Sequence, residues 1–142
     1  EKAYRKALEL APDIAIAANN LAWLIAENQG NLDEALQLAT AAVSRNQTQA
    51  GFYDTLGLVY LRKDLYSPAI EQFSKAVALD EANKQRSGVS ATPGYRVRLG
   101  MALAKSGYKI AARREAEISL RSISEMNQRE LSDARKILAN TL

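Results

Sequence analysis

The chain has 142 residues, 47% hydrophobic and 25% charged, which suits one domain or a run of small repeats with a buried core. It contains no cysteine and no histidine, which excludes disulfides, zinc–thiolate sites and cysteine nucleophiles and removes the commonest general base. The net charge of +3 is uneven: residues 1–83 carry seven basic and eleven acidic residues, and residues 84–142 carry twelve and five. This composition argues against an enzyme and favours a helical binding module without cofactor or metal.

Apolar residues recur at the i, i+3, i+4 spacing of amphipathic helices along most of the chain. The expected helices span residues 1–10, 14–28, 32–45, 50–63, 67–84, 94–106, 109–123 and 128–141. No apolar run reaches membrane-spanning length. Three residues that tolerate a left-handed backbone, Gly30, Asp64 and Gly107, are expected in the turns between paired helices. Asn127 and Glu130 have the spacing of a capping box, and the last helix is amphipathic, with Leu142 on its apolar side.

Small residues recur at a fixed distance, which is the signature of a repeat array. Ala35 and Ala69 lie 34 residues apart, and the pair Leu56-Gly57 recurs 43 residues later as Leu99-Gly100. The nine extra residues fall in the polar segment 83–93, which we interpret as an inserted surface loop. Insertions confined to turns are what a stack of helical pairs tolerates.

One unit resembles the tetratricopeptide repeat in full, and its neighbours resemble it in part. The fully matching residues are Tyr53, Leu56, Gly57, Tyr60, Ala69 and Phe73. The following unit has Arg96 where the family has an aromatic residue. The resemblance implies an all-α, right-handed solenoid of antiparallel helix pairs, closed by a C-terminal capping helix.

The implied domain map has one tetratricopeptide domain over residues 1–142. Residues 1–12 end a truncated repeat, residues 14–47, 49–82 and 94–123 form three units, and residues 127–142 form the cap. Because the chain begins without methionine inside a helical pattern, we expect a fragment of a larger bacterial protein. Its compartment stays open, because cytoplasm and periplasm both tolerate the absence of cysteine.

In the family, the first helices of the units line a concave groove that binds extended peptides or partner helices. The resemblance therefore implies a non-catalytic interaction scaffold that binds a peptide or partner helix. The basic excess after residue 84, together with three basic groove positions, further predicts a ligand that is acidic at one end. The implied groove residues are Asn19, Asn20, Trp23, Glu27, Asp54, Thr55, Leu58, Arg62, Arg98, Met101 and Lys105. Some family members clamp a carboxylate with Lys, Asn and Arg side chains. Asn20 and Arg98 match two such positions, whereas Gly94 replaces a clamp lysine.

Two alternatives stay open at the level of sequence. Tyr4 and Leu8 lie on a helix without its pairing helix, so an open apolar end could mediate self-association into a homo-oligomer. The basic C-terminal half could instead bind nucleic acid, although it lacks the interleaved aromatic residues of known modules. Its basic patch comprises Lys105, Lys109, Arg113, Arg114 and Arg121.

Overall fold

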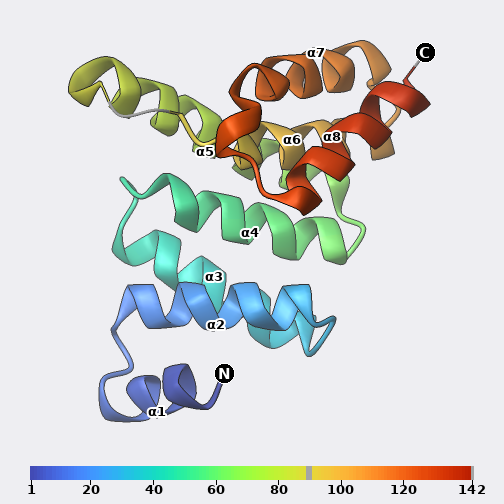
Figure 1. Cartoon of the computed structure of the whole chain (residues 1–142). Coiled ribbons are helices and arrows are strands. Elements are labelled where there is room, and N and C mark those ends of the chain that lie inside the picture. The colour runs from blue at the N-terminus through green and yellow to red at the C-terminus, as the bar shows by residue number, and fades with distance from the viewer. Residues whose placement is uncertain (89–90, 142) are drawn as a thin grey trace.

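The computed structural model describes residues 1–88 and 91–141, and throughout this part the chain is helical without strands (Figure 1). Val89 and Ser90 of the expected loop, and Leu142 of the expected last helix, lie outside the described residues. The helices are α1 (Lys2–Leu10), α2 (Ala15–Glu27), α3 (Leu32–Arg45), α4 (Ala50–Arg62), α5 (Tyr66–Ser87), α6 (Pro93–Lys105), α7 (Lys109–Ser119) and α8 (Gln128–Asn140), with a 3₁₀ helix at Leu120–Glu125. The all-α prediction is confirmed.

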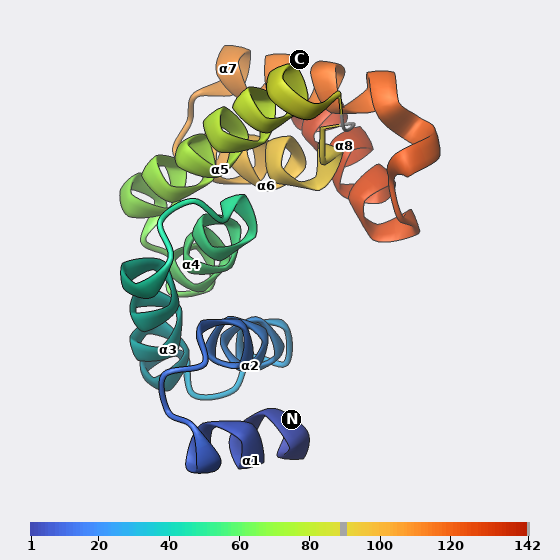
Figure 2. The same cartoon turned by 90° about the vertical axis from the view of Figure 1, so that its left-hand side faces the viewer.

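The helices form consecutive pairs, α2 with α3, α4 with α5 and α6 with α7, that stack into a curved solenoid. Figure 2 shows the curve from the side, with α2, α4 and α6 on its inner face and α3 and α5 on its outer face. The final helix, α8, packs against α6 and α7 and lies on the inner side of the curve. The inner face is therefore built from three first helices and bordered by α8.

Each pair reverses through a tight turn that contains a residue with positive φ. Asp64 (φ 58°) and Gly107 (φ 86°) occupy the expected positions. In the first turn the left-handed residue is Gln29 (φ 52°), so the expectation for Gly30 is wrong by one position. Gly30 is instead packed close to the Ile25 side chain, where a Cβ would lie 3.2 Å from Cγ2.

The segment after residue 82 is not a loop from its start, which corrects the predicted insertion over residues 83–93. Helix α5 continues to Ser87 and ends where Gly88 adopts φ 70°. Residues 83–87 contain neither Gly nor Pro, and a polar sequence can remain helical when solvent surrounds it. Their polarity therefore indicates exposure, whereas the helix stops at the first glycine.

The main core lies between the paired helices and depends on close contact of α4 with α5. Phe73 is fully buried, and its ring lies against Gly57. A Cβ at position 57 would lie 2.6 Å from the Phe73 ring atoms Cδ1 and Cε1. The Leu-Gly pair of the repeat thus serves helix packing, because only glycine leaves room for the aromatic ring.

We expect Gly57→Ala to lower the free energy of unfolding by about 1–3 kcal/mol, because the added methyl group overpacks the contact with Phe73. Gly51→Ala, on the same helix, is the matched control. Its Cβ would meet only the Tyr95 hydroxyl at 3.4 Å, so we expect no loss of stability. Urea denaturation followed by circular dichroism measures both, and equal stabilities of the two variants would contradict this packing role.

None of the helices in the described residues is both long and apolar enough to cross a membrane.

Candidate functional site

A cleft of about 260 Å³ lies on the inner face of the solenoid between α2, α4, α6 and the beginning of α8. Its walls include six of the residues that the resemblance placed in the groove: Trp23, Glu27, Leu58, Arg62, Arg98 and Met101. The remaining lining comes from Val97 and from Asn127, Arg129, Glu130 and Asp133 near the start of α8. The repeat pattern places no groove residue on this last helix.

Arg98 is the central charged group of the cleft. Its Nε donates to Asp54 Oδ1 at 2.7 Å, its Nη1 lies 3.6 Å from Glu130 Oε1, and its guanidinium stacks 5.1 Å from the centroid of the Trp23 ring. Only 15% of the Arg98 side chain is exposed. Burial raises the pKa of Asp54 above its usual value, and the Arg98 charge opposes that rise. The guanidinium is therefore held between two carboxylates and an indole ring.

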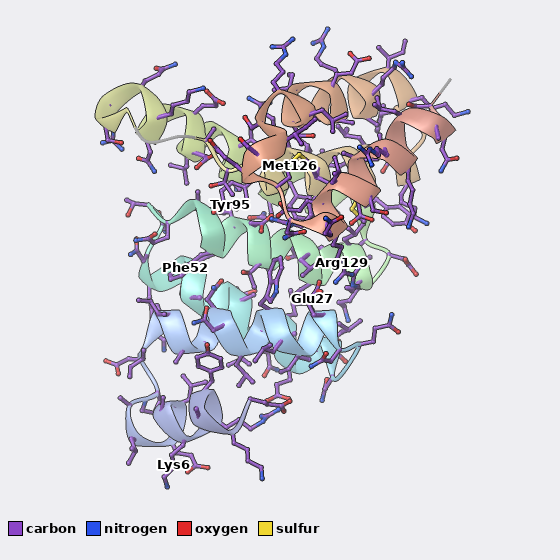
Figure 3. All side chains as sticks on the ribbon, viewed as in Figure 1. Lys6, Glu27, Phe52, Tyr95, Met126 and Arg129 are labelled. Carbon is purple, nitrogen blue, oxygen red and sulfur yellow. The ribbon has the colours of Figure 1, made fainter. Side chains whose placement is uncertain are left out.

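Glu27 forms a second charged centre at the other side of the cleft. Arg62 Nη2 donates to Glu27 Oε1 at 3.3 Å, and Arg129 donates to Glu27 Oε2. Figure 3 shows the labelled side chains of Glu27 and Arg129 facing each other between α2 and α8. These contacts connect the first full unit, the second unit and the last helix, which lie far apart in the sequence.

Other residues expected in the groove differ in accessibility. Asp54 and Thr55 are buried at 3% and 2% exposure, Asp54 beneath Arg98, and the Thr55 hydroxyl donates to the Gly51 carbonyl at 3.0 Å. In this conformation neither offers surface to a partner. Asn19 Nδ2 donates to Asn20 Oδ1 at 3.3 Å, and within the described residues Asn20 Nδ2 has no hydrogen-bond acceptor. The unpaired Asn19 Oδ1 is buried, so Asn20 is the more available of the two amides.

Lys105 is exposed at the end of α6, and among the described residues it has no ion-pair partner. It lines a second hollow of about 450 Å³, which shares Arg62 and Met101 with the cleft. The groove thus continues from Trp23 past Met101 to a free cation. Within the basic patch, Arg113 pairs with Glu117 at 3.0 Å, while Arg114 is exposed on α7, away from the cleft.

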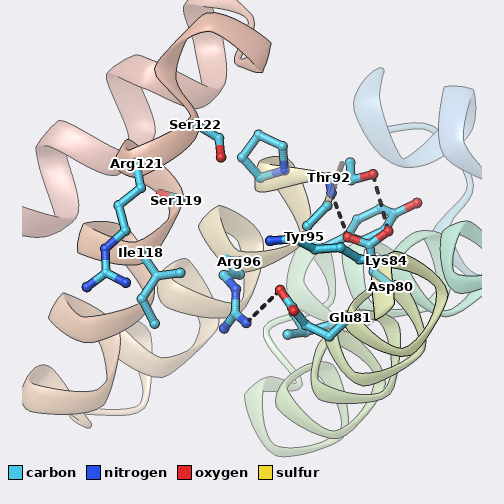
Figure 4. A pocket seen from close by; sticks show the side chains of 13 residues that line it. Asp80, Glu81, Lys84, Thr92, Tyr95, Arg96, Ile118, Ser119, Arg121 and Ser122 are labelled. Carbon is cyan, nitrogen blue, oxygen red and sulfur yellow. Dashed lines mark hydrogen bonds and ion pairs between the residues drawn. The ribbon is translucent and has the colours of Figure 1, made fainter. Parts of the chain in front are cut away.

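A separate cavity of about 340 Å³ lies between α5, α6 and the end of α7 (Figure 4). Arg96 donates to Glu81 at 3.3 Å and to Glu115 at 2.8 Å, and the backbone N–H of Thr92 donates to Asp80. Arg96, which replaces the family's aromatic residue, thus joins three helices by ion pairs. These ion pairs hold α5, α6 and α7 together beside the cavity.

At the N-terminal end, Tyr4 and Leu8 are half-buried and pack against the core. The exposed large apolar side chains there are Leu10, Ile14 and Ile16, at 76%, 40% and 64% exposure. Tyr4 and Leu8 are therefore partly covered, whereas neighbouring apolar side chains at this end of the fold are exposed. Elsewhere, the described residues contain no group of three or more Asp or Glu side chains arranged to hold a metal ion.

Comparisons with known proteins agree with this architecture. Tetratricopeptide repeat models match residues 3–37 and 50–83. A crystal structure of MamA superposes with a TM-score of 0.69 at 19% identity, covering 99% of this chain and 74% of that one. The Pseudomonas aeruginosa PilF structure gives 0.68 at 21% identity, covering 97% and 62%.

The second tetratricopeptide domain of human RPAP3, solved in complex with the HSP70 peptide SGPTIEEVD, has a TM-score of 0.58 at 17% identity, covering 84% of this chain and 97% of that one. No curated protein sequence matches significantly. At these identities the structural likeness concerns the fold. The two matching repeat models identify the family. The chain belongs to the tetratricopeptide repeat family and has its solenoid of helical pairs.

Proposed function

We propose that the chain is a non-catalytic scaffold that binds an acidic segment of a partner protein in its concave groove. The groove is formed by the units at residues 14–47, 49–82 and 94–123 and runs from Asn20 and Trp23 to Lys105. The observation that carries this proposal is the cleft at Trp23, Leu58 and Met101, which offers apolar contact between polar and charged groups. Such a mixture is typical of sites that bind peptides.

The charges of the groove support an acidic ligand. Arg62 and Glu27 pair with each other, whereas Lys105 has no partner in the described part of the chain. A carboxylate bound near Lys105 would therefore gain an ion pair without breaking an existing one. The acidic peptide held by the RPAP3 domain, SGPTIEEVD, is a suitable first probe because it carries three acidic side chains.

We expect Lys105→Glu to weaken binding of SGPTIEEVD by about three- to ten-fold, because the exposed cation becomes a repelling anion. Trp23 is the only tryptophan and lines the cleft, so its fluorescence follows the titration. The control variant, Arg114→Glu, makes the same charge change on α7 outside the groove. The control peptide, SGPTIQQVN, lacks the acidic side chains and should bind more weakly.

The proposal fails if Arg114→Glu weakens binding while Lys105→Glu does not. Failure of SGPTIEEVD to bind any more tightly than SGPTIQQVN would contradict an acidic ligand. High salt should also weaken the interaction, because exposed charge pairs are screened.

A further inference from the structure

The start of α8 lies inside the groove, although α8 is also the helix that closes the last unit. Its second half is anchored in the core, where Ala134 and Ile137 are buried beside Val97 and Ala112. Its first turns instead present polar side chains to the cleft: Arg129 pairs with Glu27, and Glu130 lies against Arg98. The helix thus has an apolar anchor and a polar end that contacts partner-facing residues.

The space for Glu130 depends on Gly94 at the beginning of α6. A Cβ at position 94 would lie 2.8 Å from Arg98 Nη2 and closer still to Glu130 Oε1. The equivalent position in the preceding unit, 43 residues earlier, is Gly51, where a Cβ would meet only the Tyr95 hydroxyl at 3.4 Å. Gly94 therefore leaves open the volume that the Glu130 carboxylate occupies beside Arg98.

We propose that the first turns of α8 are an intramolecular ligand of the groove, which an acidic partner displaces. This inference rests on the proposed function, and it identifies the Glu130 carboxylate as the group that the partner must replace. Glu130 supplies a carboxylate to Arg98 in the closed groove, so a displacing ligand supplies its own carboxylate at the same guanidinium. The exchange is charge-neutral: Arg98 remains between two carboxylates, one of them the buried Asp54.

The contacts of α8 in the groove suit a displaceable ligand. Arg129 is 62% exposed, so its ion pair with Glu27 contributes little to stability. Glu130 and Arg98 are each only 15% exposed, but their closest approach of 3.6 Å is longer than a hydrogen bond. A tethered group nevertheless competes well, because its attachment gives it a high effective concentration at the site. Since Ala134 and Ile137 remain buried in the core, the first turns can leave the cleft while the second half of α8 stays in place.

Hydrogen–deuterium exchange of the full chain tests the docking without any partner. We expect Gly94→Ala to accelerate exchange in residues 128–135 several-fold, while α2 to α5 exchange as in the wild type. Gly51→Ala is the matched control and should leave α8 unchanged. If both variants exchange alike in residues 128–135, Gly94 does not accommodate a docked Glu130 and the inference is overturned.

A second variant, Glu130→Gln, tests the competition with less risk to the fold. Glutamine can retain the capping box with Asn127, but it removes the charge that faces Arg98. We expect Glu130→Gln to bind SGPTIEEVD several-fold more tightly than the wild type does. The exposed control, Glu125→Gln, should bind the peptide with the affinity of the wild type. Equal affinities of Glu130→Gln and wild type would overturn the competition but leave the proposed function intact. If SGPTIEEVD binds neither the wild type nor the variants, the proposed function and the competition are both contradicted. The hydrogen–deuterium exchange experiment would still show whether the first turns of α8 dock in the groove.

Discussion

Arg98→Met should lower the free energy of unfolding by about 3–5 kcal/mol, because it leaves a buried carboxylate without its partner. Asp54 is 3% exposed and accepts the Arg98 Nε hydrogen bond at 2.7 Å. Methionine fills a similar volume but cannot compensate the charge. Urea denaturation at neutral pH, followed by circular dichroism, measures the difference.

The pH dependence identifies the cause of that loss. Burial raises the pKa of Asp54, and in the variant no Arg98 charge opposes the rise. A group with a raised folded-state pKa stabilises the fold when protonated and loses that contribution as pH rises through the folded-state value. The deficit of Arg98→Met should therefore shrink on acidification. The double variant Arg98→Met/Asp54→Leu, which lacks both charges, should regain most of the stability at neutral pH. A double variant as unstable as Arg98→Met would assign the loss to packing.

Phe73→Ala should cost about 3–5 kcal/mol of unfolding free energy, because it empties the centre of the main core. The Phe73 side chain has no exposed surface and lies in the cluster that joins all three units. Thermal and urea denaturation should both show the loss. A stability within 1 kcal/mol of wild type would contradict the assignment of Phe73 to the core, since collapse of neighbours rarely recovers so much.

Combining changes at positions 57 and 73 tests the contact itself. Gly57→Ala introduces a methyl group against the ring, so shortening Phe73 to leucine should relieve part of the clash. The double variant Gly57→Ala/Phe73→Leu should therefore be more stable than the sum of the two single effects predicts. Strict additivity would indicate that the two residues do not interact.

The fold was predictable because its determinants are local or periodic. Helical spacing, the 34-residue period and the Leu56-Gly57 pair predict paired helices, and the capping box at Asn127 and Glu130 is present in the structure. Polarity alone predicts the end of α5 too early, because helix continuation depends on backbone propensity as far as Gly88.

The site was less predictable, because it depends on contacts between distant segments. Spacing places Asp54 and Arg98 on the correct helices, but it does not show that Arg98 covers Asp54. The Arg129–Glu27 pair joins residues 102 positions apart, and no periodic signal relates them. Gly94 is the one sequence feature that points to the place where α8 enters the groove, because the family has a lysine side chain at this position.

We expect partners to bind on the concave face, where the first turns of α8 lie. A ¹⁵N–¹H correlation spectrum of the full chain, titrated with SGPTIEEVD, tests it most directly. We predict that the Trp23 indole N–H and the backbone amides of Gly94, Lys105 and Glu130 shift together with a common affinity. Shifts confined to Arg114 and its neighbours on α7, with the Trp23 and Gly94 signals unmoved, would contradict the account.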